Sequence, residues 1–140
     1  AEMFVTAWLG LLDLHNGVLQ YVNAGHNPPL LREKDGTFSS LRTKPNLVLA
    51  GMDMIRYGKH EMQLQPGAQI FLYTDGVTEA ANIQNELYGE DRLEQVLNGA
   101  CGTPQELCSK VADDIDAFVQ DAEQSDDITM LCVQWNGSAQ

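Results

Sequence analysis

Apolar residues in the first quarter of the chain follow the patterns of β-strands. The stretch from Phe4 to Leu14 is almost continuously apolar and contains Val, Trp and Thr, which predicts a strand buried on both faces. The run from Val18 to Ala24 alternates as a hairpin partner would, and the polar "DLHNG" between the two runs supplies a turn. The sequence therefore predicts that the chain opens with an antiparallel hairpin.

Further strand signals follow up to residue 73. In "NAGHNPPLLRE", Gly25 permits unusual backbone angles, and Pro28 with Pro29 imposes an extended path into an apolar pair. "KDG" turns the chain before "TFSSLRT", and "HEMQLQPGAQIFLY" predicts a strand, a turn at Pro66 and a second strand. Between them, the segment from Pro45 to Gly58 has no regular period, so we expect a connecting segment there.

The second half adds two amphipathic helices. Glu90 and Asp91 open a short one, which we expect Asn98 and Gly99 to end with a left-handed residue. The "TPQE" that begins at Thr103 is a capping box and starts a longer helix that extends to about Gln120. The apolar positions expected to face inward are Leu93, Val96 and Leu97 in the first helix and Leu107, Val111, Ile115, Phe118 and Val119 in the second.

The final pattern completes the fold class. Asp113, Asp114 and Asp116 fall outside the apolar stripe of the long helix, and we interpret them as its solvated side. "SDDITMLCVQW" places an acidic pair directly before an alternating strand. With 140 residues, no repeats and no linker, the sequence predicts one α+β domain built mostly of antiparallel strands.

Composition excludes several kinds of partner. The formal net charge of -12 repels phosphate backbones and anionic lipids, so we expect no nucleic acid and no membrane partner. No apolar run reaches the roughly 18 residues of a membrane span, and no signal-peptide pattern is present, which favours a cytoplasmic location. The three cysteines, Cys101, Cys108 and Cys132, include no C-x-x-C pair and are interpreted as reduced core thiols. Twenty acidic residues, by contrast, offer many ligands for cations.

Two strand ends carry the candidate chemistry. Asp75 stands just past an apolar strand, and Gly76 offers a backbone that can approach a metal, a water or a phosphate. Asp126 and Asp127 stand just before the last strand. Carboxylates fixed at strand ends suit a hard divalent cation, and two such ends that meet above a sheet would repel each other without one.

Each of these signals has a structural alternative. Asp-Gly between apolar runs is also the strongest short signal for a hairpin, and an acidic pair is also a common solvated strand entrance. His26 is either a general acid or ligand, or a turn residue with local hydrogen bonds. The residues alone do not show that Asp75 and Asp126 meet in space.

Taken in order, the motifs "NAGHNPP", "LYTDGVTEA", "YGEDRL" and "DDIT" add a family resemblance. The chain resembles the C-terminal part of the bacterial stage II sporulation E-type serine/threonine phosphatases, a branch of the metal-dependent, protein phosphatase 2C-like family. We assign residues 1–136 to this domain and residues 137–140 to a tail. The resemblance implies packed antiparallel sheets flanked by helices, an α/β-β/α sandwich that here lacks its N-terminal portion. It also implies two manganese or magnesium ions that bridge a water, which attacks a phosphoserine or phosphothreonine.

The family's site residues map onto this chain position by position. Asp75 matches the metal ligand of the D-G motif, beside Gly76, and Asp126 matches a second ligand, the first residue of D-[DN]-[IM]-[TS]. The resemblance gives Asp127 a supporting role and places His26 at the border of the site, where eukaryotic relatives carry the Asp of a Gly-Asp pair. No protein nucleophile is then expected. The implied partner is a phosphorylated anti-sigma factor antagonist in a partner-switching pathway.

One departure from the family pattern qualifies these expectations. The family domain normally begins upstream, with a Gly-Asp motif whose aspartate ligates both metals, and this chain begins at Ala1 without it. We therefore expect weak metal binding by this chain alone, and exposed core surface that favours a homodimer. The alternative function is a non-catalytic interaction module that has kept the fold and lost the metals. A small calcium-binding module is disfavoured because no D-x-[DN]-x-[DN]-G loop occurs.

Overall fold

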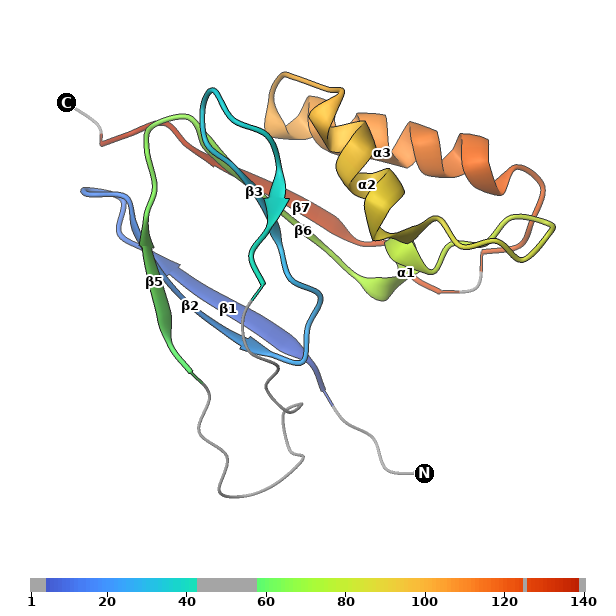
Figure 1. Cartoon of the computed structure of the whole chain (residues 1–140), viewed down its shortest axis with the longest axis horizontal. Helices are drawn as coiled ribbons and strands as arrows, with labels where there is room; N and C mark the ends of the chain where they lie inside the picture. The colour runs from blue at the N-terminus through green and yellow to red at the C-terminus, as the bar shows by residue number, and fades with distance from the viewer. Residues whose placement is uncertain (1–4, 43–57, 125, 139–140) are drawn as a thin grey trace.

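Two antiparallel sheets and a pair of helices form three layers (Figure 1). The computed structural model describes residues 5–42, 58–124 and 126–138, and the expected connecting segment lies outside these ranges except for Gly58. The strands are β1 (Ala7–Leu12), β2 (Val18–Ala24), β3 (Leu30–Arg32), β4 (Ser39–Ser40), β5 (His60–Gln63), β6 (Ala68–Tyr73) and β7 (Met130–Trp135), and the helices are α1 (Asp75–Thr78), α2 (Gly89–Asn98) and α3 (Pro104–Val119).

The strands divide into a three-stranded sheet of order β1-β2-β5 and a four-stranded sheet of order β4-β3-β6-β7. Every strand pair in the described part of the chain is antiparallel. The predicted turn at Pro66 and Gly67 is present, but β5 and β6 do not pair with each other. Instead, Gly67, with φ of 96°, lets the chain pass from one sheet to the other.

Strand β6 lies between two hydrophobic cores. Ala68 and Ile70 face the three-stranded sheet, where they pack with residues such as Tyr21. Phe71 and Tyr73 face the opposite way and pack with α2 and α3, which cover the outer face of the four-stranded sheet (Figure 1). Burial on both faces explains why "AQIFLY" is almost wholly apolar instead of alternating.

The first hairpin is confirmed, but the predicted burial of its first strand is wrong. β1 pairs with β2 from Ala7↔Ala24 to Leu12↔Leu19. Leu9 and Leu11, however, are 72% and 69% exposed, because β1 is an edge strand and no described element covers the outer face of its sheet. An apolar sequence predicts that a strand can be buried. Whether it is buried depends on another element that covers it, which the strand's own sequence does not reveal.

The two predicted helices form, although the end of the first differs from the prediction. Gly99 at the end of α2 has φ of −85°, so the expected left-handed residue is absent there; Gly89 at its start has φ of 80° instead. The side chain of Asn98 forms two hydrogen bonds with the backbone of Phe38. Its Oδ1 accepts from Phe38 N at 2.6 Å, and its Nδ2 donates to Phe38 O. In α3 the capping box is confirmed, since Thr103 Oγ1 accepts a hydrogen bond from Glu106 N at 3.2 Å.

The prediction that Asp114 lies on the solvated side of α3 is wrong. Its carboxylate accepts hydrogen bonds from Arg92 at 2.9 and 3.2 Å and from the Tyr88 hydroxyl at 2.7 Å. These bonds link α2 to α3. Asp113 and Asp116 are exposed, as predicted.

The cysteines are free, but only two of them contact the core. Cys108 and Cys132 are half-buried between α3 and β7, and Cys101 is exposed, so the interpretation as core thiols is wrong for Cys101. Burial raises the pKa of the Cys132 thiol to about 11 and also raises that of Cys108. Within the described ranges, no helix is long and apolar enough to cross a bilayer.

Candidate functional site

The Asp-Gly pair after β6 is not a hairpin turn. Asp75 and Gly76 open the short helix α1, with Thr74 in an extended conformation at its N-cap. β6 pairs with β3 on one side and with β7 on the other, so the chain after Asp75 does not return along β6. The hairpin alternative is therefore excluded.

The two acidic motifs meet because β6 and β7 are antiparallel. Tyr73, near the end of β6, pairs with Met130, the first residue of β7, so the segment before β7 lies beside the segment after β6. Thr74 joins the two: its N–H donates to Thr129 O at 3.1 Å, and its hydroxyl oxygen accepts from Thr129 N at 3.2 Å. The same hydroxyl donates to Asp127 O at 3.2 Å. These contacts supply the spatial meeting that the sequence alone left open.

Gly76 makes a close approach possible between the two segments. A Cβ added at this buried position would collide with the backbone carbonyl of Asp127 and would lie 3.2 Å from Ile128 N. Both neighbours are backbone atoms, which cannot rotate away as a side chain can. Glycine is thus required here so that the D-G motif can pack directly against the segment that carries Asp126.

An open cleft of about 350 Å³ gathers most of the predicted site residues. The side chains of Asp75, Asp126 and Asp127 are exposed along it, whereas Gly76 lines an adjacent cavity of about 50 Å³ together with Asp126. The cleft is lined by Thr6, Gly25, His26, Asn27, Thr74, Asp75, Asp126, Asp127 and Thr129.

His26 has the local hydrogen bonds of a turn residue, and its role as a general acid or ligand stays a prediction. Its backbone N–H donates to Asn23 Oδ1 at 2.8 Å, its carbonyl accepts from Asn23 Nδ2 at 3.0 Å, and its ring Nδ1 lies 3.0 Å from Asn27 O. Gly25 has φ of 75°, which allows the tight loop that these bonds close. His26 is thus a turn residue with local hydrogen bonds, and it also lines the cleft.

Asn27 is the contact that sequence reasoning missed. Its Nδ2 donates a 2.7 Å hydrogen bond to Oδ1 of Asp75. A signal was available in the Pro that follows it, because a residue before proline is held in an extended conformation that fixes where its side chain projects. The loop that Asn23 closes therefore presents Asn27 to the D-G motif.

The arrangement places hard oxygen donors from two motifs on one cleft. Carboxylates that share one cleft repel each other, and a cation removes that cost. Within the described residues, however, no group of three or more His, Cys, Asp or Glu side chains is placed to hold a metal ion. The roles of Asp75 and Asp126 as metal ligands therefore stay a prediction.

The architecture matches a known class of enzyme domain. The structure resembles the phosphatase domain of the cell fate determinant SpoIIE from Bacillus subtilis with a TM-score of 0.73 and 16% identity, over 96% of this chain and 60% of that one. A manganese-presoaked form of that domain matches with the same TM-score, over 58% of its length. The fold is therefore that of a protein phosphatase 2C-like domain, which confirms the predicted fold class of antiparallel sheets flanked by helices.

Sequence comparison gives the family. Residues 1–136 match the family model described as stage II sporulation protein E (SpoIIE), so the chain belongs to the SpoIIE family. It is 31% identical to Protein IcfG of Synechocystis sp. over 134 residues, and 29% identical to the phosphoserine phosphatase RsbU of Bacillus subtilis over 135 residues. Each match covers 96% of this chain but only 21% and 40% of those relatives, so the chain spans a fifth to two fifths of their lengths.

Proposed function

We propose that this chain is the C-terminal part of a metal-dependent phosphatase that hydrolyses phosphoserine or phosphothreonine in a protein. The observation that carries the proposal is the meeting of Asp75 and Asp126 on one open cleft at the ends of two paired strands. Membership of the SpoIIE family and similarity to a protein named phosphoserine phosphatase support the same chemistry.

Asp75 and Asp126 are the ligands that we propose for manganese or magnesium. Bound metal ions would supply a water of lowered pKa as the nucleophile, which fits a cleft with no serine or cysteine among the lining residues that the structure describes. Asn27 orients the carboxylate of Asp75, and Thr74 holds the segment that carries Asp126. We assign Asp127 and His26 supporting positions on the same cleft, and a further carboxylate outside this set completes the centre.

The substrate that we propose is a phosphorylated anti-sigma factor antagonist in a bacterial partner-switching pathway, in the cytoplasm. This choice rests on the family and not on a substrate pocket. The net charge of -12 disfavours a nucleic acid partner. An open cleft suits a protein substrate better than an enclosed cavity does. The phosphorylated side chain must reach the site while it is still attached to a folded partner.

Manganese titration calorimetry tests the proposal, with hydrolysis of an aryl phosphate followed in parallel. We expect weak, saturable binding that the double variant Asp75→Asn, Asp126→Asn abolishes, and turnover that falls with it. The matched control is Asp113→Asn with Asp116→Asn, which removes two exposed carboxylates from α3 and should leave binding unchanged. Equal loss in both double variants would show that the cleft is not the metal site.

The alternative is a non-catalytic interaction module, and the observation that favours it is that no group of three metal-ligating side chains occurs among the described residues. The same titration on a longer chain that includes the family's upstream Gly-Asp motif separates the two. A phosphatase gains tight binding and turnover in that chain, whereas an interaction module gains neither. Formation of a homodimer stays a prediction, which sedimentation velocity over a range of concentrations would test.

A further inference from the structure

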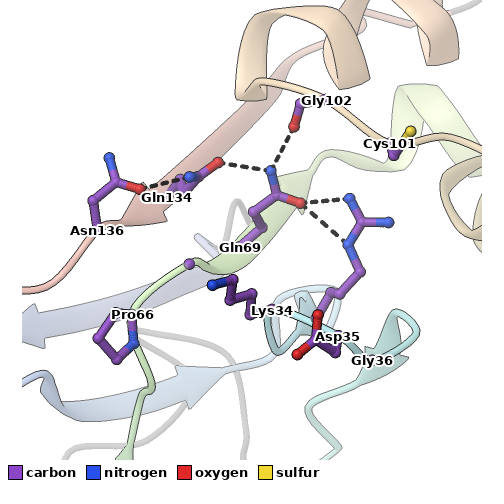
Figure 2. A pocket seen from close by; sticks show the side chains of 11 residues that line it. Lys34, Asp35, Gly36, Pro66, Gln69, Cys101, Gly102, Gln134 and Asn136 are labelled. Carbon is purple, nitrogen blue, oxygen red and sulfur yellow. Dashed lines mark hydrogen bonds between the residues drawn. The ribbon is translucent and has the colours of Figure 1, made fainter.

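A second pocket lies at the opposite end of the four-stranded sheet from the aspartate cleft. Its volume is about 580 Å³, and Gln69, the second residue of β6, forms part of it. Asp75 is six residues further along the chain, roughly 20 Å at the rise of a β-strand. The residues drawn in Figure 2 come from β3 and the turn after it, β6 and the turn before it, the loop before α3, and β7 with the segment that follows it. This pocket therefore shares no lining residue with the aspartate cleft.

Arg32 places a cation in this pocket without a carboxylate to neutralise it. Its Nη1 donates to Ala100 O at 2.8 Å, and its Nε and Nη2 donate to Gln69 Oε1 at 3.2 and 2.6 Å. The guanidinium carbon lies 4.5 Å from the centre of the Phe38 ring. All of these partners are neutral, and within the described ranges Arg32 forms no ion pair. The half-buried charge is thus held in place but not compensated.

A chain of amides runs from Arg32 through Gln69 and Gln134 to Asn136 in a single direction. Because a guanidinium only donates, the atom of Gln69 that faces Arg32 must be its oxygen, and its Nε2 must face away. That Nε2 donates to Gln134 Oε1 at 2.8 Å and to Gly102 O at 2.9 Å. Gln134 Nε2 then donates to Asn136 Oδ1 at 2.6 Å (Figure 2). Arg32 therefore fixes the orientation of three amides in succession.

This polarity leaves N–H donors at both ends of the network. Arg32 carries five N–H groups, of which three make the bonds described, so two remain. At the other end, Nδ2 of Asn136 donates to no group in the described part of the chain. Lys34 adds a second cation to the lining, and Asp35 is the one acidic side chain there. The pocket offers a surplus of donors and of positive charge, on a chain whose net charge is -12.

We propose that this pocket binds an oxyanion, the phosphate or carboxylate group of a small ligand. Such a group accepts several hydrogen bonds at once and neutralises the charge of Arg32 and Lys34. The volume suits a small molecule. The inference does not rest on the proposed phosphatase function, because it involves neither the aspartate cleft nor a metal ion.

The test is a titration of the chain with sodium phosphate, and separately with sodium citrate, in a Tris buffer with EDTA and followed by NMR. We expect saturable shifts of the Gln69, Gln134 and Asn136 side-chain amide signals and of the Arg32 Nε–H signal. The Asp126→Asn variant, which alters the other cleft, should bind both probes as the unaltered chain does. The probe that binds more tightly identifies the preferred oxyanion.

Two adjacent substitutions should change the affinity in opposite directions. Lys34→Gln removes a cation and should weaken binding roughly fivefold, whereas Asp35→Asn removes the acidic neighbour and should strengthen it by a similar factor. The control is Lys110→Gln, which makes the same charge change at an exposed position on α3. Binding should also weaken as salt is added, because the attraction is partly screened.

Three results would overturn the proposal. The first is the absence of saturable shifts at the four pocket signals with both probes. The second is saturable shifts confined to Asn27 and its neighbours in the aspartate cleft. The third is an equal loss of affinity in Lys34→Gln and Lys110→Gln, because the effect would then be that of net charge alone.

Discussion

The side-chain amide of Asn27 donates a 2.7 Å hydrogen bond to Oδ1 of Asp75, a residue 48 positions further along the chain. Because Oδ1 is held by a residue on a different loop, the orientation of the whole Asp75 carboxylate, including Oδ2, is fixed. A carboxylate that is oriented in this way can meet a cation without first losing rotational freedom. Asn27 is thus a positioning residue for the proposed metal ligand.

Replacement of Asn27 tests that role. We expect Asn27→Ala to lower manganese affinity or aryl phosphate turnover by about 10- to 100-fold, the range found for groups that orient metal ligands. The free energy of unfolding should change by no more than about 1 kcal/mol, because one partly exposed hydrogen bond is lost. Gln105→Ala, at an exposed position on α3, is the control. A loss of stability that accounts for all of the lost affinity would contradict a positioning role.

Gly76→Ala should disrupt the contact between the two acidic motifs. The added methyl group collides with the Asp127 carbonyl, so the segment before β7 must shift and the free energy of unfolding should fall by about 1–3 kcal/mol. Gly36→Ala is the matched control, because the nearest atom to its added Cβ is 3.7 Å away. Chemical denaturation of both variants measures the difference, and equal stability of the two would show that the close approach is not present in solution.

Asp114 should make the stability of the α2–α3 pair depend on pH. The hydrogen bonds from Arg92 hold the pKa of Asp114 below its usual value, so the folded state keeps this carboxylate ionised where the unfolded chain takes up a proton. Its contribution is complete above the ordinary aspartate pKa of about 3.9 and is lost as the pH falls through the lower folded-state value.

We expect Asp114→Ala to lower the free energy of unfolding by about 1 kcal/mol at pH 7, a modest value because the Arg92 side chain is 40% exposed. The difference from the unaltered chain should shrink as the pH approaches about 3. Asp113→Ala, on the exposed side of the same helix, should show neither effect. Urea denaturation at both pH values measures this, and a deficit that stays constant with pH would rule out the ionised pair as its cause.

The three cysteines should react with a thiol reagent at different rates. Only the thiolate reacts, and burial raises the pKa of both Cys108 and Cys132, whereas Cys101 is exposed. At pH 8 we expect one fast equivalent of reaction and two slow ones, and Cys101→Ser should remove the fast equivalent. Three equal rates would contradict the packing of β7 against α3.

Local chemistry in the sequence predicted several local structures, although not the end of α2, where Gly99 is not left-handed. The capping box at Thr103 and the hairpin turn between β1 and β2 depend on residues within a few positions of each other, and both are present. The family motifs, in turn, identified the fold class. The cleft was predicted only in part. The sequence selected Asp75 and Asp126 as candidates, but their meeting depends on the pairing of β6 with β7, which are separated along the chain by the helices.

The features that were missed depend on distant partners. Asn27 acts on a residue 48 positions away, and Asp114 looked solvated until α2 brought Arg92 and Tyr88 to it. Leu9 appeared buried because an apolar strand does not reveal whether another layer covers it. The pocket around Gln69 could not be predicted from the sequence, because its hydrogen-bond network joins β3, β6 and β7, which are far apart along the chain.

The position of β7 has a consequence for how the protein is made. β7 is the last strand that the structure describes, yet it pairs with β6 along its whole length and brings Asp126 to Asp75. A ribosome releases residues 126–135 only at the end of this segment, so a nascent chain holds β6 with one edge open while α2 and α3 are already synthesised. The cleft is therefore assembled only after residues 126–135 have been synthesised, and a chain that stops before Asp126 lacks both the second acidic motif and the strand that covers the free edge of β6.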